Sequence, residues 1–133
     1  MTQTNVLLVD DQELVRSGLR RILRARDGFQ IVAECSDGGE VDAALAAHAV
    51  DVIVMDLRMK GVDGIEATRR VSETDGPPVL VLTTFDDDEM LSGALRAGAS
   101  GFMSNESVYA RSGLEASFDA MPSTVQESRP PLR

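Results

Sequence analysis

Three aspartates and a threonine stand directly after short apolar runs, and their side chains could do chemistry together. Asp10 and Asp11 follow one run. Asp56 follows a second run and Thr83 a third. Carboxylates that come together repel one another and need a cation, and oxygen ligands that leave room for water suit Mg²⁺. Such an ion would offset the charge of a phosphoryl group. A carboxylate could then act as the nucleophile that forms an acyl phosphate, and the Thr83 hydroxyl could hydrogen-bond a phosphoryl oxygen.

The elements that would position these residues are short apolar runs that alternate with segments of helical periodicity. Strands are predicted at residues 5–9, 29–34, 50–55, 79–82 and 101–103. Helices are predicted at residues 14–23, 40–47 and 63–73, from 86 onward, and at 107–120. Asp63 is the predicted N-cap of the third helix, with Glu66 at the capping-box position. Alternation of this kind implies right-handed crossovers and a parallel sheet covered on both faces, which is a doubly wound α/β domain with five strands.

The predicted fold brings the polar residues to one place. In a doubly wound sheet the functional crevice lies outside the carboxyl ends of the strands, where the strand order switches. The loops after the first, third and fourth strands carry Asp10 with Asp11, then Asp56, then Thr83. We therefore expect these side chains to converge, although they are far apart in the sequence.

Composition limits the class of protein. The 133 residues carry a formal net charge of −9, which argues against nucleic acid as a direct partner. No apolar run approaches the ~20 residues that a membrane-spanning helix needs, and the single cysteine, Cys35, cannot form an internal disulfide, so a cytoplasmic protein is expected. A cluster of arginines is interpreted as a solvated helix face: Arg16, Arg20, Arg21, Arg24 and Arg26.

Four segments resemble the successive motifs of response-regulator receiver domains of bacterial two-component systems. They are VLLVDDQELVRSGL, DVIVMDLRMKGVDGIE, VLVLTTFDDDE and ALRAGASGF, and they span residues 6–102. They are most similar to the NarL/LuxR-type regulators, which carry a helix-turn-helix output domain. The resemblance implies a flavodoxin-like receiver fold with strand order 2-1-3-4-5. It also implies a sensor histidine kinase as phosphoryl donor and a homodimer as one active form. The domain would then control an output, usually transcription. It would be a signalling domain with at most slow self-dephosphorylation.

The resemblance assigns roles to the acidic residues. Asp56 matches the phosphoacceptor, and Asp10 and Asp11 match the acidic pair that binds Mg²⁺. The backbone carbonyl of Arg58 falls where the family supplies a further metal ligand. Mg²⁺ is therefore the expected cofactor.

The resemblance also assigns a switch and shows two departures. Thr83 matches the switch hydroxyl, and Phe102 matches the switch aromatic, whose rotamer is expected to follow the movement of Thr83. Val62 stands where the family more often has proline. Asn105 stands where the family has its lysine, so the cation that would pair with the phosphoryl group is missing.

The C-terminal part of the chain departs further, since the resemblance fades from Ser104 onward. We expect a receiver domain over residues 1–121 that is atypical after residue 103, a flexible tail over residues 122–133, and no output domain. Two explanations stay open: a natural stand-alone or degenerate receiver, or a reading frame that diverges near this point.

Rival functions make different demands on the sequence. A pseudo-receiver that signals without phosphorylation is favoured by Asn105. A haloacid-dehalogenase-type phosphatase normally has a second acid two residues after its nucleophile, where this chain has Arg58. A flavodoxin-like flavin carrier needs a first loop that cradles phosphate, which Asp10 and Asp11 would repel.

Overall fold

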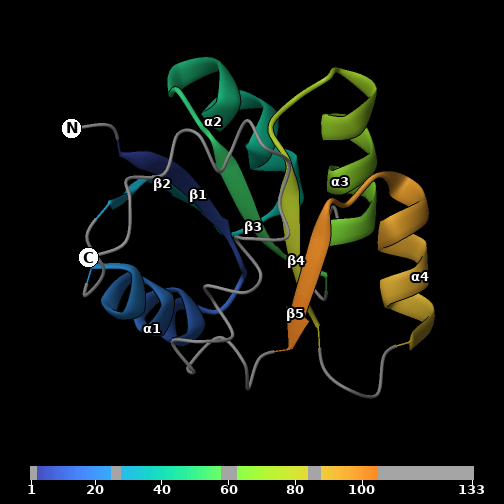
Figure 1. The fold of residues 1–133 in the computed structure, drawn as a ribbon, viewed down its shortest axis with the longest axis horizontal. Coiled ribbons are helices and arrows are strands. Elements are labelled where there is room, and N and C mark those ends of the chain that lie inside the picture. Colours follow the sequence, from blue (N-terminus) through green and yellow to red (C-terminus); the bar gives the residue numbers. More distant parts are fainter. Residues whose placement is uncertain (1–2, 25–27, 58–62, 84–87, 105–133) are drawn as a thin grey trace.

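A computed structural model describes residues 3–24, 28–57, 63–83 and 88–104, which form a three-layer α/β domain (Figure 1). The strands are β1 (Thr4–Val9), β2 (Phe29–Cys35), β3 (Val52–Asp56), β4 (Val79–Thr83) and β5 (Gly101–Ser104). The helices are α1 (Glu13–Arg24), α2 (Val41–Ala47), α3 (Gly64–Glu73) and α4 (Asp88–Ala97), with a 3-10 turn, η1 (Gly38–Glu40), before α2. All strand pairs are parallel and the order is β2-β1-β3-β4-β5, so the predicted doubly wound fold and strand order are confirmed.

Helices cover both faces of the sheet, and alternate residues of the central strands point into two cores. One core lies between the sheet and α1, where Leu19 and Leu23 pack against one set of strand residues. The other core contains residues of α2, α3 and α4 packed on the opposite set. Every residue of β3 from Val52 to Met55 is at most 3 % exposed. Burial on both faces explains why this strand is a continuous apolar run rather than an alternating one.

Element boundaries differ from the sequence prediction by one or two residues at many ends, including the starts of β3 and α2. The third strand starts at Val52 and not at residue 50. Just before it, the backbone N–H of Asp51 donates to the carbonyl of Asn5 (2.8 Å), and side chains add further contacts. The Asp51 carboxylate accepts from the backbone N–H of Asn5 (2.7 Å), and the Asn5 amide donates to the carbonyl of Ala49 (2.9 Å). Glu40 lies in the 3-10 turn rather than in α2.

The predicted N-cap of α3 is confirmed. The Asp63 side chain caps α3 by accepting from the backbone N–H of Glu66 (2.8 Å), as predicted. The Glu66 carboxylate itself pairs with Arg69 and Arg70 on the helix surface. The predicted helix at residues 107–120 and the tail at residues 122–133 lie outside the described residues.

The arginines of α1 are not simply a solvated face, so that interpretation is wrong for two of them. The side chains of Arg16 and Arg20 are only 14 % and 25 % exposed, and both pair with Glu34 of β2. The reason is that β2 presents a carboxylate toward α1, which draws the two guanidinium groups onto the sheet. Arg21 is exposed, as expected.

A buried hydroxyl at the start of β1 yields a prediction. Thr4 is fully buried, and its Oγ1 atom has no hydrogen-bond partner in the structure as described. Because an unpaired buried hydroxyl destabilises the folded state, Thr4→Val should raise the free energy of unfolding by about 1 kcal/mol in urea titrations. Thr68 is the matched control, since it is equally buried but its hydroxyl donates to the carbonyl of Gly64 (2.6 Å). An equal gain in Thr68→Val would contradict the explanation.

Candidate metal and phosphoryl-acceptor site

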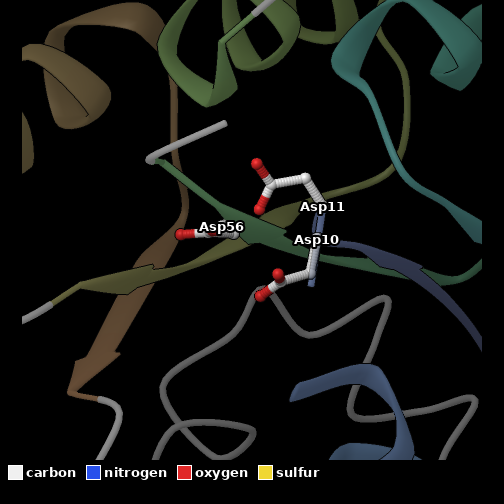
Figure 2. A group of neighbouring side chains, drawn as sticks. All are labelled: Asp10, Asp11 and Asp56. Carbon is white, nitrogen blue, oxygen red and sulfur yellow. The ribbon is translucent and has the colours of Figure 1, made fainter. Parts of the chain in front are cut away.

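Three aspartates meet at the carboxyl edge of the sheet. β1 and β3 are neighbours in the register Val9 to Met55, so the residues that follow, Asp10 and Asp56, lie side by side. Figure 2 shows Asp10 and Asp11 at the end of β1 and Asp56 at the end of β3. One carboxylate oxygen from each of the three residues lies within 4.8 Å of those from the other two. The predicted convergence of these three residues is confirmed.

Asp10 is the most enclosed of the three and is only 3 % exposed. Its backbone N–H donates to the carbonyl of Cys35 (3.0 Å), and its carboxylate accepts from the N–H of Gln12 (2.8 Å). Burial raises the pKa of Asp10 because the charged form loses water, and the negative charge of Asp11 adds to this; the Gln12 hydrogen bond and the charge of Arg16 act in the opposite direction. The fold thus holds the charged carboxylate where it is poorly hydrated, and a bound cation would offset the resulting loss of stability.

The donor set fits a hard divalent cation. Carboxylate oxygens are the ligands that Mg²⁺ prefers, and in its octahedral shell, with bonds of about 2.1 Å, ligands lie up to about 4.2 Å apart. The oxygens of the three aspartates span little more than this. Small side-chain rotations would therefore bring Asp10, Asp11 and Asp56 onto one ion. Asp11 and Asp56 are partly exposed, which leaves room for water or a phosphoryl group.

The first turn of α3 packs directly on the backbone of the acidic site. The N–H of Gly64 donates to the carbonyl of Leu57 (3.3 Å). A Cβ atom on Gly64 would lie 2.2 Å from the carbonyl oxygen of Asp56 and 2.6 Å from the Cα atom of Leu57. Only glycine lets the helix approach this closely. The sequence gave no sign of this contact.

The predicted switch residues lie on β4, which neighbours β3, and on β5, the edge strand beyond it. Thr83 ends β4 opposite Ser104 of β5, and Phe102 pairs with Val81. The side chain of Phe102 is 51 % exposed. The side chain of Thr83 is outside what the structure describes.

Several other predicted positions fall outside the described residues. Arg58, with the carbonyl expected to bind metal, lies there, as do Val62 and Asn105.

Sequence reasoning missed one residue that touches the site. The guanidinium of Arg16 donates to the backbone carbonyl of Asp10 and to the carboxylate of Glu34 (3.1 Å). The sequence did place Arg16 in the first turns of the helix that follows the acidic loop, which could have indicated that it lies near the site. Its partner on β2 could be identified only from the fold.

The thiol of Cys35, which ends β2 beside the acidic loop, is excluded as a nucleophile. Burial raises the pKa of the Cys35 thiol to about 11, and the nearby charge of Glu40 adds to the effect. The thiol is therefore neutral at physiological pH, and a neutral thiol is a poor nucleophile. Of Cys35 and the three aspartates, the aspartate carboxylates are therefore the candidate nucleophiles.

The close contact at Gly64 yields a prediction. In Gly64→Ala the new methyl group would collide with backbone that cannot rotate away, so we expect a loss of about 1–3 kcal/mol in unfolding free energy and shifted amide NMR signals at Asp56 and Leu57. Gly93→Ala is the control, because among the described residues a Cβ there meets only the Ile65 side chain, at 3.2 Å, and alanine favours a helix. Equal effects of the two substitutions would argue against a special role for Gly64.

The burial of Asp10 yields another prediction. Because its pKa is raised in the folded chain, the charged form destabilises the fold, so without metal Asp10→Asn should unfold at a higher temperature than the native chain at neutral pH. The difference should vanish as the pH falls below about 4, where the carboxyl is protonated in both the folded and the unfolded chain. Calorimetry in a chelator would measure this. The exposed cap variant Asp63→Asn should show no such gain, since asparagine caps helices equally well.

Sequence comparisons give relatives for most of the chain. Residues 6–108 match the response regulator receiver domain family. The chain is 43 % identical over 101 residues to the response regulator UvrY of Escherichia coli O6:H1, which covers 75 % of this chain and 46 % of UvrY. It is 42 % identical over 99 residues to the transcriptional regulatory protein LiaR of Bacillus subtilis, covering 74 % and 47 % of the two chains. The chain thus spans about half the length of these curated relatives.

Solved structures agree with the sequence relatives. The signal receiver domain of the response regulator NarL from Mycobacterium tuberculosis superposes with a TM-score of 0.80 at 30 % identity, covering 90 % of this chain and 96 % of that one. A LuxR-family two-component response regulator from Aurantimonas gives 0.79 at 33 % identity, covering 96 % of each chain. Among the described helices, none has the length and apolar character to span a bilayer. On its sequence, fold and strand order, the chain belongs to the response regulator receiver domain family.

Proposed function

We propose that this chain is a phosphorylation-controlled receiver that takes a phosphoryl group on Asp56 from a sensor histidine kinase. The observation that carries the proposal is the meeting of Asp10, Asp11 and Asp56 within 4.8 Å at the carboxyl edge of β1 and β3. A structural role alone does not require three like charges at one edge, whereas a metal-assisted phosphoryl acceptor does.

The chemistry follows from the positions of the acids. A carboxylate oxygen of Asp56 attacks the phosphorus of a phosphohistidine, the P–N bond breaks, and the imidazole nitrogen keeps the electron pair and takes up a proton. The product is an acyl phosphate on Asp56. Asp10 and Asp11 would hold Mg²⁺ together with Asp56 and the backbone carbonyl of Arg58. When bound, this ion offsets negative charge on the phosphoryl group.

The proposed readout of phosphorylation is a change in the surface formed by α4 and β5. Thr83 lies opposite Ser104, and Phe102 is two residues before Ser104 on the same strand. Residues two apart on a strand share a face, so Thr83 and Phe102 occupy diagonal positions on one face of the sheet. This placement supports a switch in which Phe102, half exposed here, turns inward when Thr83 moves toward the phosphoryl group.

The proposed output is the control of transcription, through a homodimer or through release of an output domain. This rests on the relatives, because LiaR is named as a transcriptional regulatory protein. The net charge of −9 argues that this part of the protein does not itself contact nucleic acid. The domain would signal rather than turn over a substrate, with slow self-dephosphorylation as its only catalysis.

A pseudo-receiver that works without phosphorylation is the second candidate. Asn105 favours it, because asparagine supplies no charge where the family lysine would pair with the phosphoryl group. The two candidates differ in whether Asp56 reacts and in whether the reaction changes the surface of the domain.

Intact-mass spectrometry after incubation with acetyl phosphate tests the proposal. We expect one added phosphoryl group that requires Mg²⁺ and is absent from Asp56→Asn, because only an ionised, metal-assisted carboxylate reacts. The exposed Asp63→Asn variant controls for loss of any aspartate and should be modified like the native chain. A folded chain that takes up no phosphoryl group would favour the pseudo-receiver.

A second measurement separates reaction from signalling. Gel filtration of the phosphorylated native chain and of phosphorylated Asn105→Lys would show whether each changes its oligomeric state. A change in the lysine variant alone would mean that the native site accepts phosphoryl without switching.

A further inference from the structure

Arg16 connects three parts of the fold at the edge of the acidic site. From α1, its guanidinium donates to the backbone carbonyl of Asp10 after β1, to the carboxylate of Glu34 on β2 (3.1 Å), and to the carboxylate of Glu13 (2.5 Å). The side chain is only 14 % exposed. A planar guanidinium has several donors in a fixed arrangement, so contacts in three directions fix its position and that of the groups it binds.

The contact with Asp10 matters because the carbonyl belongs to the loop that carries two of the three acids. Asp10 and Asp11 are consecutive, and like charges in this loop push it away from Asp56. The bond from the Asp10 N–H to the carbonyl of Cys35 and the bond from the Gln12 N–H to the Asp10 carboxylate also hold the loop. A charged donor on the Asp10 carbonyl adds a stronger hydrogen bond than a neutral donor would.

Arg20 makes nearly the same ion pairs but does not share this contact. It donates to Glu34 (2.5 Å) and to Glu13 (2.9 Å), the two carboxylates that Arg16 also binds. Among the described residues, the hydrogen bonds of Arg20 go to these two carboxylates and not to the acidic loop. Substituting either arginine weakens the α1–β2 contact, but only substitution of Arg16 also removes the contact with the acidic loop. Comparing the two variants therefore separates the stability of the α1–β2 contact from the order of the site.

We propose that Arg16 is a positioning residue for the metal site: it holds the loop of Asp10 and Asp11 against β2 so that their carboxylates stay aligned with Asp56. The part that concerns metal binding rests on the proposed function. The part that concerns the order of the loop does not, because it can be measured without metal. Arg16 would act through the backbone of Asp10 and not as a metal ligand, since a guanidinium offers only donors.

Amide hydrogen exchange in metal-free protein tests the order of the loop. The N–H of Gln12 is protected by the Asp10 carboxylate and reports on the loop directly. We expect its exchange to be about tenfold faster in Arg16→Gln, in line with the loss of one hydrogen bond to a charged group, and to be unchanged in Arg20→Gln. Equal exchange in the two variants would overturn the proposal, whatever the result with metal.

Calorimetric titration with Mg²⁺ tests the effect on the site. Loss of a residue that orients metal ligands typically lowers affinity by about 10- to 100-fold, so the dissociation constant should rise by at least about tenfold in Arg16→Gln and stay near the native value in Arg20→Gln. If the native chain binds Mg²⁺ and both variants bind as it does, the positioning role fails. If the native chain binds no Mg²⁺, the proposed function fails, and the exchange of Gln12 alone decides the role of Arg16.

Folding must be intact for either comparison. Far-ultraviolet circular dichroism and thermal unfolding of each variant provide this check, since both substitutions remove ion pairs to Glu13 and Glu34. Should Arg16→Gln fail to fold, Arg16→Lys keeps the charge but loses the fixed set of donors. It should then show faster exchange at Gln12 than Arg20→Lys, and equal exchange would again overturn the proposal.

Discussion

Repulsion between carboxylates at one edge of the sheet is the constraint around which this domain is organised. Asp10, Asp11 and Asp56 lie within 4.8 Å of one another, and Asp10 has lost nearly all contact with water. Such a group would spread apart on a flexible scaffold, because like charges gain free energy by separating. Its persistence requires that the backbone beneath it cannot move.

The two strands that carry the acids supply that rigidity. β1 and β3 lie side by side in the middle of the sheet and are covered by helices on both faces, and all residues from Val6 to Val9 are at most 1 % exposed. One register, Val9 to Met55, then sets where Asp10 and Asp56 stand. Shifting that register by one residue would turn every core side chain of the strand to the wrong face, so hydrophobic packing fixes the geometry of a polar site.

Much of this arrangement could be predicted because it depends on local sequence and on general rules of parallel sheets. The apolar runs located the strands, the position of Asp63 gave the cap of α3, and the rule that crevices lie at carboxyl ends brought Asp10 together with Asp56. The contacts of Arg16 with Glu34, and of Gly64 with the backbone of Asp56, could not be predicted. Each joins segments whose distance depends on how a helix packs on the sheet, and no spacing in the sequence reports that.

The charge of the site also bears on what Asn105 means for signalling. A phosphoryl group adds negative charge to a cluster that already holds three carboxylates, and the family lysine would neutralise part of it. In the described structure Arg16 cannot neutralise this charge in place of the lysine, because its guanidinium is bound to the carbonyl of Asp10 and to two glutamates. Under the proposed function, neutralising the phosphoryl group would thus depend on Mg²⁺ to a greater extent than in a receiver with lysine. Asparagine can still donate hydrogen bonds, so under the proposed function Asn105 would weaken the link between the phosphoryl group and the surface more than the acceptor chemistry, which would need only the carboxylates and the ion.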